Sequence, residues 1–183
     1  MRRIICPALL VTAACAGSGA PPAPAVELAP VLGRAQAVLS DSAGRRVGVA
    51  TFVAREDGVS IGVSVTGLPP GEHGLHIHEH GRCDPPSFET AGGHFAPQGR
   101  QHGTEAEGGP HAGDLPNLVV FEHGTGRLGT HNERVALDDG DNGLFGGDGT
   151  ALVVHAGPDD HRTQPSGASG DRIACGVIER SER

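Results

Sequence analysis

The stretch "RVGVATFVAREDGVSIGVSVTGL", residues 46–68, decides the fold class of this chain. In its two halves, 46–54 and 59–68, apolar residues alternate with small or polar ones, a period of two that is typical of strands. Turn sequences rich in Gly, Asp and Asn separate it from other strand-like segments, which are 35–41, 115–121, 133–137, 150–155 and 173–178. We therefore predict an all-β fold, a Greek-key antiparallel β-barrel or sandwich.

The composition agrees with a turn-rich β-domain. The 183 residues include 30 glycines and 14 prolines, and they contain no tryptophan or tyrosine. All 14 basic residues are arginines, and the formal net charge is -8. Because nucleic acid and anionic membrane surfaces attract positive charge, we expect neither as a partner.

The N-terminus has the composition of an export signal. Arg2 and Arg3 precede a mostly apolar run, 4–14, which is too short to span a bilayer, so residues 1–20 are predicted to be a signal peptide. "VTAAC" (11–15) resembles a bacterial lipoprotein box, in which Cys15 would carry a lipid tether, and ordinary cleavage near "ACA" (14–16) is the alternative. Residues 21–33 are predicted to be a flexible Pro/Ala linker and 34–183 the folded domain. We therefore expect an exported protein, in the periplasm or at the cell surface.

Two cysteines, Cys83 and Cys175, lie in the predicted folded domain. An exported protein meets an oxidising compartment, so an even pair favours a disulfide, with two buried free thiols as the alternative. Such a bridge would close a loop of about 90 residues and stabilise the fold by about 4 kcal/mol in the chain-entropy model.

Histidines are numerous, 11 in all, and several are clustered. "GLHIHEHG" (74–81) places His76, His78 and His80 at every second position, on one face of an extended strand. Two segments, 81–113 and 156–171, are too long for simple turns, and long ordered loops on a β scaffold usually carry function. The further candidate ligands are His94, His102, His111, Asp114 and His155. Many imidazoles with one carboxylate suit zinc or copper, whereas calcium and magnesium prefer oxygen ligands.

Five motifs together resemble the copper/zinc superoxide dismutase family. They are "GLHIHEHG", "AGGHFAP", "PHAGDLPN", "ALVVHAGPDD" and "GDRIACGVI", and the resemblance covers about residues 36–178. The motifs "AGGHFAP" and "HAGPDD" are similar to those of the exported bacterial branch of the family. The resemblance implies copper ligands at His76, His78, His94 and His155. It implies zinc ligands at His94, His102, His111 and Asp114.

In this family pattern His94 is shared, as an imidazolate that bridges the two metals. Losing both ring protons at neutral pH becomes easy only between two cations. The zinc set has four protein ligands and no open position, which is the mark of a structural site. The resemblance further implies that Asp159, with Asp160 as the alternative, links a copper-ligand ring to a zinc-ligand ring.

The implied function is superoxide dismutation, which yields dioxygen and hydrogen peroxide, as an antioxidant defence outside the cytoplasm. Arg172 would guide the superoxide anion, and His94 would take up and deliver a proton. The resemblance also implies the Cys83–Cys175 disulfide. A metal-binding module without turnover is an alternative, disfavoured because all four copper ligands and Arg172 are present. A purely structural sandwich would leave the histidines unexplained, and the sequence leaves both a monomer and a homodimer open.

The chain also departs from the family pattern. It has no lysine to steer superoxide, and Asp171 directly precedes Arg172, where it is expected to weaken the local positive field. We expect His80 not to bind metal and His73 to be a structural hydrogen-bonding residue. The remaining histidines are expected at the surface: His123, His131 and His161.

Overall fold

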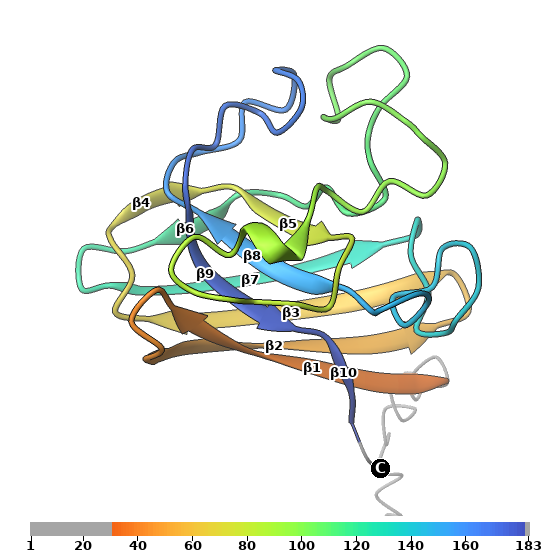
Figure 1. Ribbon diagram of the computed structural model, residues 1–183, viewed down its shortest axis with the longest axis horizontal. Helices are drawn as coiled ribbons and strands as arrows, with labels where there is room; N and C mark the ends of the chain where they lie inside the picture. The colour runs from red at the N-terminus through yellow and green to blue at the C-terminus, as the bar shows by residue number, and fades with distance from the viewer. Residues whose placement is uncertain (1–30, 182–183) are drawn as a thin grey trace, which may run out of the picture.

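The stretch 46–68 forms two neighbouring strands, β2 (Arg46–Arg55) and β3 (Gly58–Thr66). They pair antiparallel from Gly48↔Val65 to Arg55↔Gly58, and their inward side chains, such as Phe52 and Ile61, are buried. The computed structural model describes residues 31–181 (Figure 1). The predicted signal peptide, most of the linker and Cys15 lie outside these described residues.

Ten strands form one antiparallel sheet that curls into a nearly closed barrel (Figure 1). The order is β4-β6-β7-β3-β2-β1-β9-β8-β5, and β10 pairs with β1. The first and last strands in this order, β4 and β5, are consecutive in the chain and are separated by Gly74 alone. The all-β prediction is therefore confirmed. The other strands are β1 (Gly33–Asp41), β4 (Gly71–His73), β5 (Leu75–His78), β6 (Leu118–Val120), β7 (Thr125–Asn132), β8 (Ala151–His155), β9 (Arg172–Val177) and β10 (Glu179–Arg180).

The barrel interior is filled by aliphatic side chains with Phe52 as the largest member. In β5, Leu75 and Ile77 are fully buried in this core, so the intervening histidines point to the opposite face of the strand. Within residues 31–181 the helical structure is limited to one 3-10 turn, η1 (Glu89–Ala91), and no helix there is long and apolar enough to cross a membrane.

One predicted strand is wrong. Residues 133–137 form a turn that follows β7, although Val135 is buried in the core. The actual strand, β7, was not predicted because its sequence "TGRLGTHN" has one large apolar residue, Leu128. Its other inward positions hold Gly126, Thr130 and Asn132, so the apolar alternation that marks β2 and β3 is missing.

Two long loops are present, as predicted, and parts of both rise above the barrel in Figure 1. One connects β5 to β6 and the other, 156–171, connects β8 to β9. They are joined by an ion pair between Arg162 and Glu105. The Gln164 side-chain amide also accepts a hydrogen bond from the backbone N–H of His102 (2.9 Å) and donates one to its carbonyl (2.9 Å).

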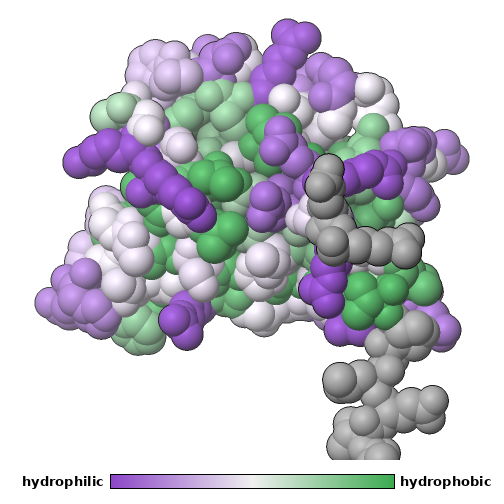
Figure 2. All heavy atoms as spheres, turned by 90° about the horizontal axis from the view of Figure 1, so that it is seen from below, coloured by the Kyte–Doolittle hydropathy of each residue, from purple (hydrophilic) through white to green (hydrophobic). Residues whose placement is uncertain are grey.

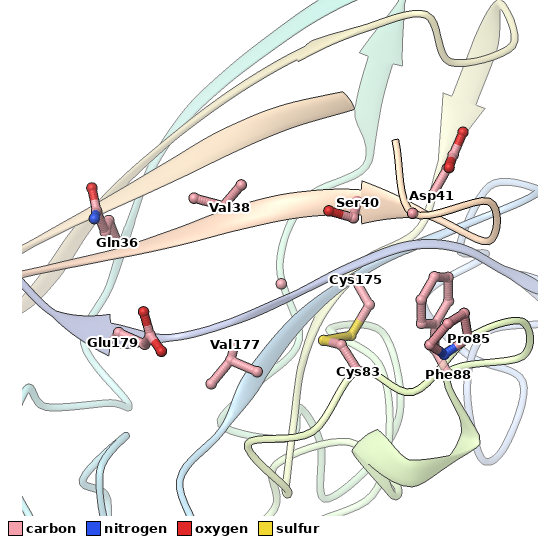
Figure 3. A pocket seen from close by; sticks show the side chains of 12 residues that line it. Gln36, Val38, Ser40, Asp41, Cys83, Pro85, Phe88, Cys175, Val177 and Glu179 are labelled. Atoms are coloured by element: carbon pink, nitrogen blue, oxygen red, sulfur yellow. A yellow bond between two sulfur atoms is a disulfide. The ribbon is translucent and has the colours of Figure 1, made fainter. Parts of the chain in front are cut away.

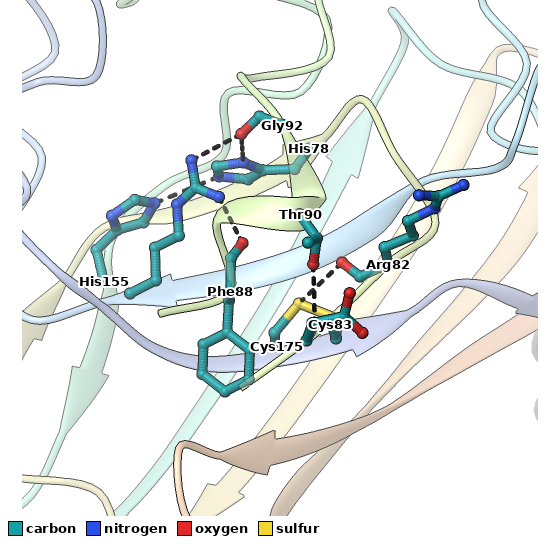
Figure 4. Close-up of a disulfide and its surroundings, with 10 residues drawn as sticks. His78, Arg82, Cys83, Phe88, Thr90, Gly92, His155 and Cys175 are labelled. Atoms are coloured by element: carbon teal, nitrogen blue, oxygen red, sulfur yellow. Dashed lines mark hydrogen bonds between the residues drawn. A yellow bond between two sulfur atoms is a disulfide. The ribbon is translucent and has the colours of Figure 1, made fainter. Parts of the chain in front are cut away.

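The predicted disulfide is confirmed, because Cys83 in the first loop is bonded to Cys175 in β9 (Figure 4). A groove of about 300 Å³ runs beside it, with Val38, Val177 and Phe88 among its lining residues (Figure 3). None of the candidate metal ligands lines this groove. Apolar and polar side chains alternate over the face seen in Figure 2.

Candidate metal centre

The two histidines of β5 provide the rigid part of the site. His76 and His78 lie on the same face of the strand and are 0% and 1% exposed. Their backbones pair with Val153 and Ala151 of β8, and His155 ends that neighbouring strand. The backbone N–H of His155 donates to Gly74 O (2.8 Å), which holds the end of β8 against the start of β5.

The first long loop folds back onto β5 and brings two more candidate ligands to it. His94 makes an isolated antiparallel bridge with His78, and Asp114 makes one with His76. Phe95 N donates to Ile77 O (2.8 Å), so the loop backbone is tied to the strand between the two histidines. Residues far apart in the sequence thus meet on one face of β5.

The side chains predicted to bind copper form one buried cluster. His76, His78, His94 and His155 each offer a ring nitrogen, and these nitrogens lie within 4.8 Å of one another. The Nε2 atoms of His78 and His155 are 3.4 Å apart. Within the described chain, His76 Nδ1 and His94 Nε2 are buried and have no hydrogen-bond partner. Buried ring nitrogens that face one another without a partner are what a metal ion requires.

The second nitrogen of three of these rings is held by an oxygen atom. His76 Nε2 is 2.8 Å from Asp159 Oδ2, His78 Nδ1 is 2.9 Å from Gly92 O, and His155 Nδ1 is 3.0 Å from Gly170 O. Such outer partners fix both the ring orientation and which nitrogen is free.

The side chains predicted to bind zinc gather around Asp114. Its Oδ1 is 2.9 Å from His94 Nδ1, 3.1 Å from His102 Nδ1 and 3.3 Å from His111 Nδ1. Grouping by proximity gives His76, His94, His102 and Asp114, and His111 Nδ1 lies 3.4 Å from His94 Nδ1. His94 therefore has one nitrogen in each cluster, which is the arrangement a bridging ligand needs.

Asp159 connects the two clusters. It accepts from His76 through Oδ2 (2.8 Å) and from His102 through Oδ1 (3.0 Å), and it is buried. Its backbone N–H and carbonyl both bond to the side-chain amide of Asn117, at 2.9 Å each. The alternative, Asp160, is exposed and caps the next turn at Arg162 instead.

Burial keeps the four rings that are predicted to bind copper neutral. It lowers the pKa of His76 to about 3 and that of His155 to about 4, and it also lowers the pKa of His78 and of His94. Neutral imidazole is the form that binds metals. Burial also acts on His102, but hydrogen bonds to its two carboxylate neighbours outweigh it and raise the pKa of His102 to about 9.

Arg172 begins β9 and is half-buried beside the copper-side cluster. Its two terminal nitrogens donate to Phe88 O (2.6 Å) and Gly92 O (2.7 Å). Gly92 O also contacts His78 Nδ1, so one carbonyl joins this arginine to a candidate copper ligand (Figure 4). Gly92 has a φ of 75°, and a Cβ here would lie 2.5 Å from His80 Cδ2, so only glycine fits.

Three predictions about the remaining histidines can be compared with the structure. His80 lies outside both clusters, 3.1 Å from Asp148 Oδ1, and His73 bonds to the carbonyls of His155 (2.7 Å) and Pro69 (2.9 Å). The surface assignment of His161 is incomplete, because its half-buried ring packs against the carboxylate of Asp159 (Nδ1 to Oδ2, 3.4 Å). Its position two residues after Asp159 was the only available sequence signal.

The β-barrel carries two adjacent buried clusters that could each hold a metal ion and that have His94 in common. The model of the family "Copper/zinc superoxide dismutase (SODC)" matches residues 46–178. The chain belongs to the copper/zinc superoxide dismutase family.

Relatives and solved structures agree with this assignment. The chain is 46% identical over 147 residues to Superoxide dismutase [Cu-Zn] 2 of Aquifex aeolicus, covering 79% of this chain and 86% of that one. It is 38% identical over 148 residues to Superoxide dismutase [Cu-Zn] of Caulobacter vibrioides, covering 79% and 85%. A crystal structure of a SOD-like protein from Bacillus subtilis superposes with a TM-score of 0.75 at 37% identity, covering 79% and 97%.

Proposed function

We propose that this enzyme, a superoxide dismutase of the copper/zinc type, works at a copper site that is bridged to a structural zinc site by His94. The observation that carries the proposal concerns two buried ring nitrogens of the copper set, His76 Nδ1 and His94 Nε2, which have no hydrogen-bond partner in residues 31–181. A dismutase combines two superoxide anions and two protons into one dioxygen and one hydrogen peroxide.

The residues present fit both metals. Copper would be held by the four clustered imidazoles, and when bound it supplies the one-electron oxidation and reduction that dismutation needs. Zinc would be held by three imidazoles and one carboxylate, which leaves no open position. The copper set is His76, His78, His94 and His155. The zinc set is His94, His102, His111 and Asp114.

Arg172 would bind and orient the superoxide anion. Its guanidinium is fixed by two backbone carbonyls, and it carries the positive charge beside the clustered rings that an anionic substrate requires. His94 Nε2 is the buried ring nitrogen that can hold a proton and pass it to the reduced substrate. Asp159 holds His76 and His102 in register with each other.

Metal loading followed by pulse radiolysis tests the proposal. The metal-free protein should take up one copper and one zinc, and the loaded protein should consume superoxide. His155→Ala should lose activity and copper, whereas His123→Ala, at an exposed position, should retain both. If the wild type binds both metals but does not consume superoxide, the proposal is refuted and the protein is a metal-binding module without turnover.

We also propose that the protein acts outside the cytoplasm, in the exported bacterial branch of the family. The charged start, the short apolar run and the Cys83–Cys175 disulfide support export. The lipoprotein-like box supports a membrane tether through Cys15, which mass spectrometry of the mature N-terminus would detect. A homodimer is a further proposal, and light scattering of the mature protein would test it.

A further inference from the structure

The chain leaves the sheet at the end of β7, beside the zinc-ligand candidates. Asn132 ends the strand and is 1% exposed, and Val135 is 3% exposed in the core. Arg134 lies between them, and its backbone N–H donates to Asn132 Oδ1 (3.0 Å). The Arg134 side chain therefore starts from a backbone that is fixed on both sides.

The Arg134 guanidinium reaches the loop segment 111–114. Its Nε donates to His111 O (3.3 Å) and its Nη2 donates to Asp114 O (3.0 Å). Both carbonyls belong to residues whose side chains form the zinc-side cluster. One rigid, planar group thus spans the segment from its first residue to its last.

The two carbonyls in between are also occupied. Asn132 Nδ2 donates to Ala112 O (2.8 Å), and Ile77 N in β5 donates to Gly113 O (2.9 Å). All four consecutive carbonyls of 111–114 therefore accept hydrogen bonds from outside the segment. Three of these bonds come from Asn132 and Arg134, which lie two residues apart.

If Arg134 acted through its charge alone, it would lower the affinity for zinc. The cation attracts the Asp114 carboxylate, but it would repel a dication bound to that carboxylate, so its charge alone weakens zinc binding. Any gain in zinc affinity from Arg134 must therefore come from its hydrogen bonds to the segment 111–114. Loss of the charge alone is expected to raise zinc affinity, whereas loss of the hydrogen bonds is expected to lower it.

We propose that Arg134, together with Asn132, is a positioning residue that holds the segment 111–114 so that His111 and Asp114 face His94 and His102 before metal binds. This inference rests on the proposed zinc site. It gives a function to the turn 133–137, which leaves the sheet and directs Arg134 towards the zinc-side loop.

Zinc binding by the metal-free, full-length protein tests the proposal. Competition against a chromophoric chelator gives the zinc dissociation constant for wild type, Arg134→Lys and Arg134→Gln. Arg127→Gln on the exposed face of β7 is the matched control. Lys retains the charge without the planar fork, and Gln removes the charge, so both lose the double contact. We expect a zinc dissociation constant about tenfold or more higher in both Arg134 variants, and no change in the control.

Hydrogen exchange of the metal-free proteins provides a second readout. Amides in 111–114 should exchange about tenfold faster in the Arg134 variants while β2 and β3 keep wild-type protection, since general destabilisation would affect those strands as well. If Arg134→Gln does not fold, Arg134→Lys carries both measurements.

Zinc dissociation constants within twofold of wild type would overturn the inference, as would tighter binding by Arg134→Gln. If the wild type itself binds no zinc, the proposed site is refuted, and the inference falls with it.

Discussion

Acidification should destabilise the metal-free protein through its buried histidines. Burial lowers the pKa of His76 to about 3 and that of His155 to about 4, whereas both have a pKa of 6.5 when exposed. The folded state therefore binds fewer protons than the unfolded state between these values. The stability that follows is fully present above pH 6.5 and is lost as the pH falls towards 4 and then 3.

The window from pH 6 to pH 5 isolates this effect. There the unfolded chain protonates these histidines and the folded chain does not, and each contributes up to about 1.4 kcal/mol per pH unit. His76 and His155 together should therefore cost about 2 kcal/mol of unfolding free energy, and the lowered pKa values of His78 and His94 act in the same direction. His102 is protonated in the folded state and mostly protonated in the unfolded state in this window, so its contribution is small and of the opposite sign. Carboxylates titrate mainly below pH 5.

Urea unfolding of the metal-free protein at pH 6 and pH 5 measures the loss directly. His76→Gln should remove about 1 kcal/mol of the predicted loss, and His123→Gln, at an exposed position, should leave the loss unchanged. A free energy of unfolding that is constant or higher at pH 5 would refute the reasoning, because it would mean that these rings are already charged in the folded protein.

Three further predictions concern residues around the site. His80→Gln should leave copper stoichiometry at one per chain, measured by metal analysis, because the ring contacts Asp148 outside the cluster; loss of copper would contradict this. Asp171→Asn should raise kcat/KM for superoxide about two- to fivefold at low salt and less at high salt, since the exposed carboxylate precedes Arg172; an unchanged rate would refute it. Cys83→Ser opens a bridge with a sequence separation of 92 and should lower the unfolding free energy by about 4 kcal/mol in guanidinium titrations, and a loss below about 1 kcal/mol would be inconsistent with it.

The sequence predicted those parts of the molecule that depend on local periodicity. Alternation gave β2 and β3, and the period-two spacing of His76 and His78 placed both on one face of a strand. It failed at β7, where Gly126 and Asn132 occupy inward positions that apolar residues usually fill.

The hydrogen bonds that support the site could not be predicted, because they join side chains to backbone atoms that are distant in the sequence. The amides of Asn117 and Gln164 bond to residues 42 and 62 positions away, and nothing in their neighbouring sequence marks those partners. Arg134 belongs to the same class, since its acceptors are carbonyls of a loop that precedes β7. A side chain that binds main-chain atoms across the fold leaves no pattern of spacing.

The copper and zinc ligand candidates are held in place by different contacts, and the two sets therefore differ in how many protons a bound metal must displace. Three of the four rings predicted to bind copper lie on β5 and β8, their outer nitrogens are bonded to oxygen atoms, and burial keeps them neutral, so metal binding displaces few protons there. On the zinc side His102 lies in a loop between two carboxylates that raise its pKa to about 9, so at neutral pH zinc must displace its proton. The zinc half therefore depends on hydrogen bonds from outside the loop, such as those of Gln164 and Arg134, to keep its ligands in place until the metal replaces that proton.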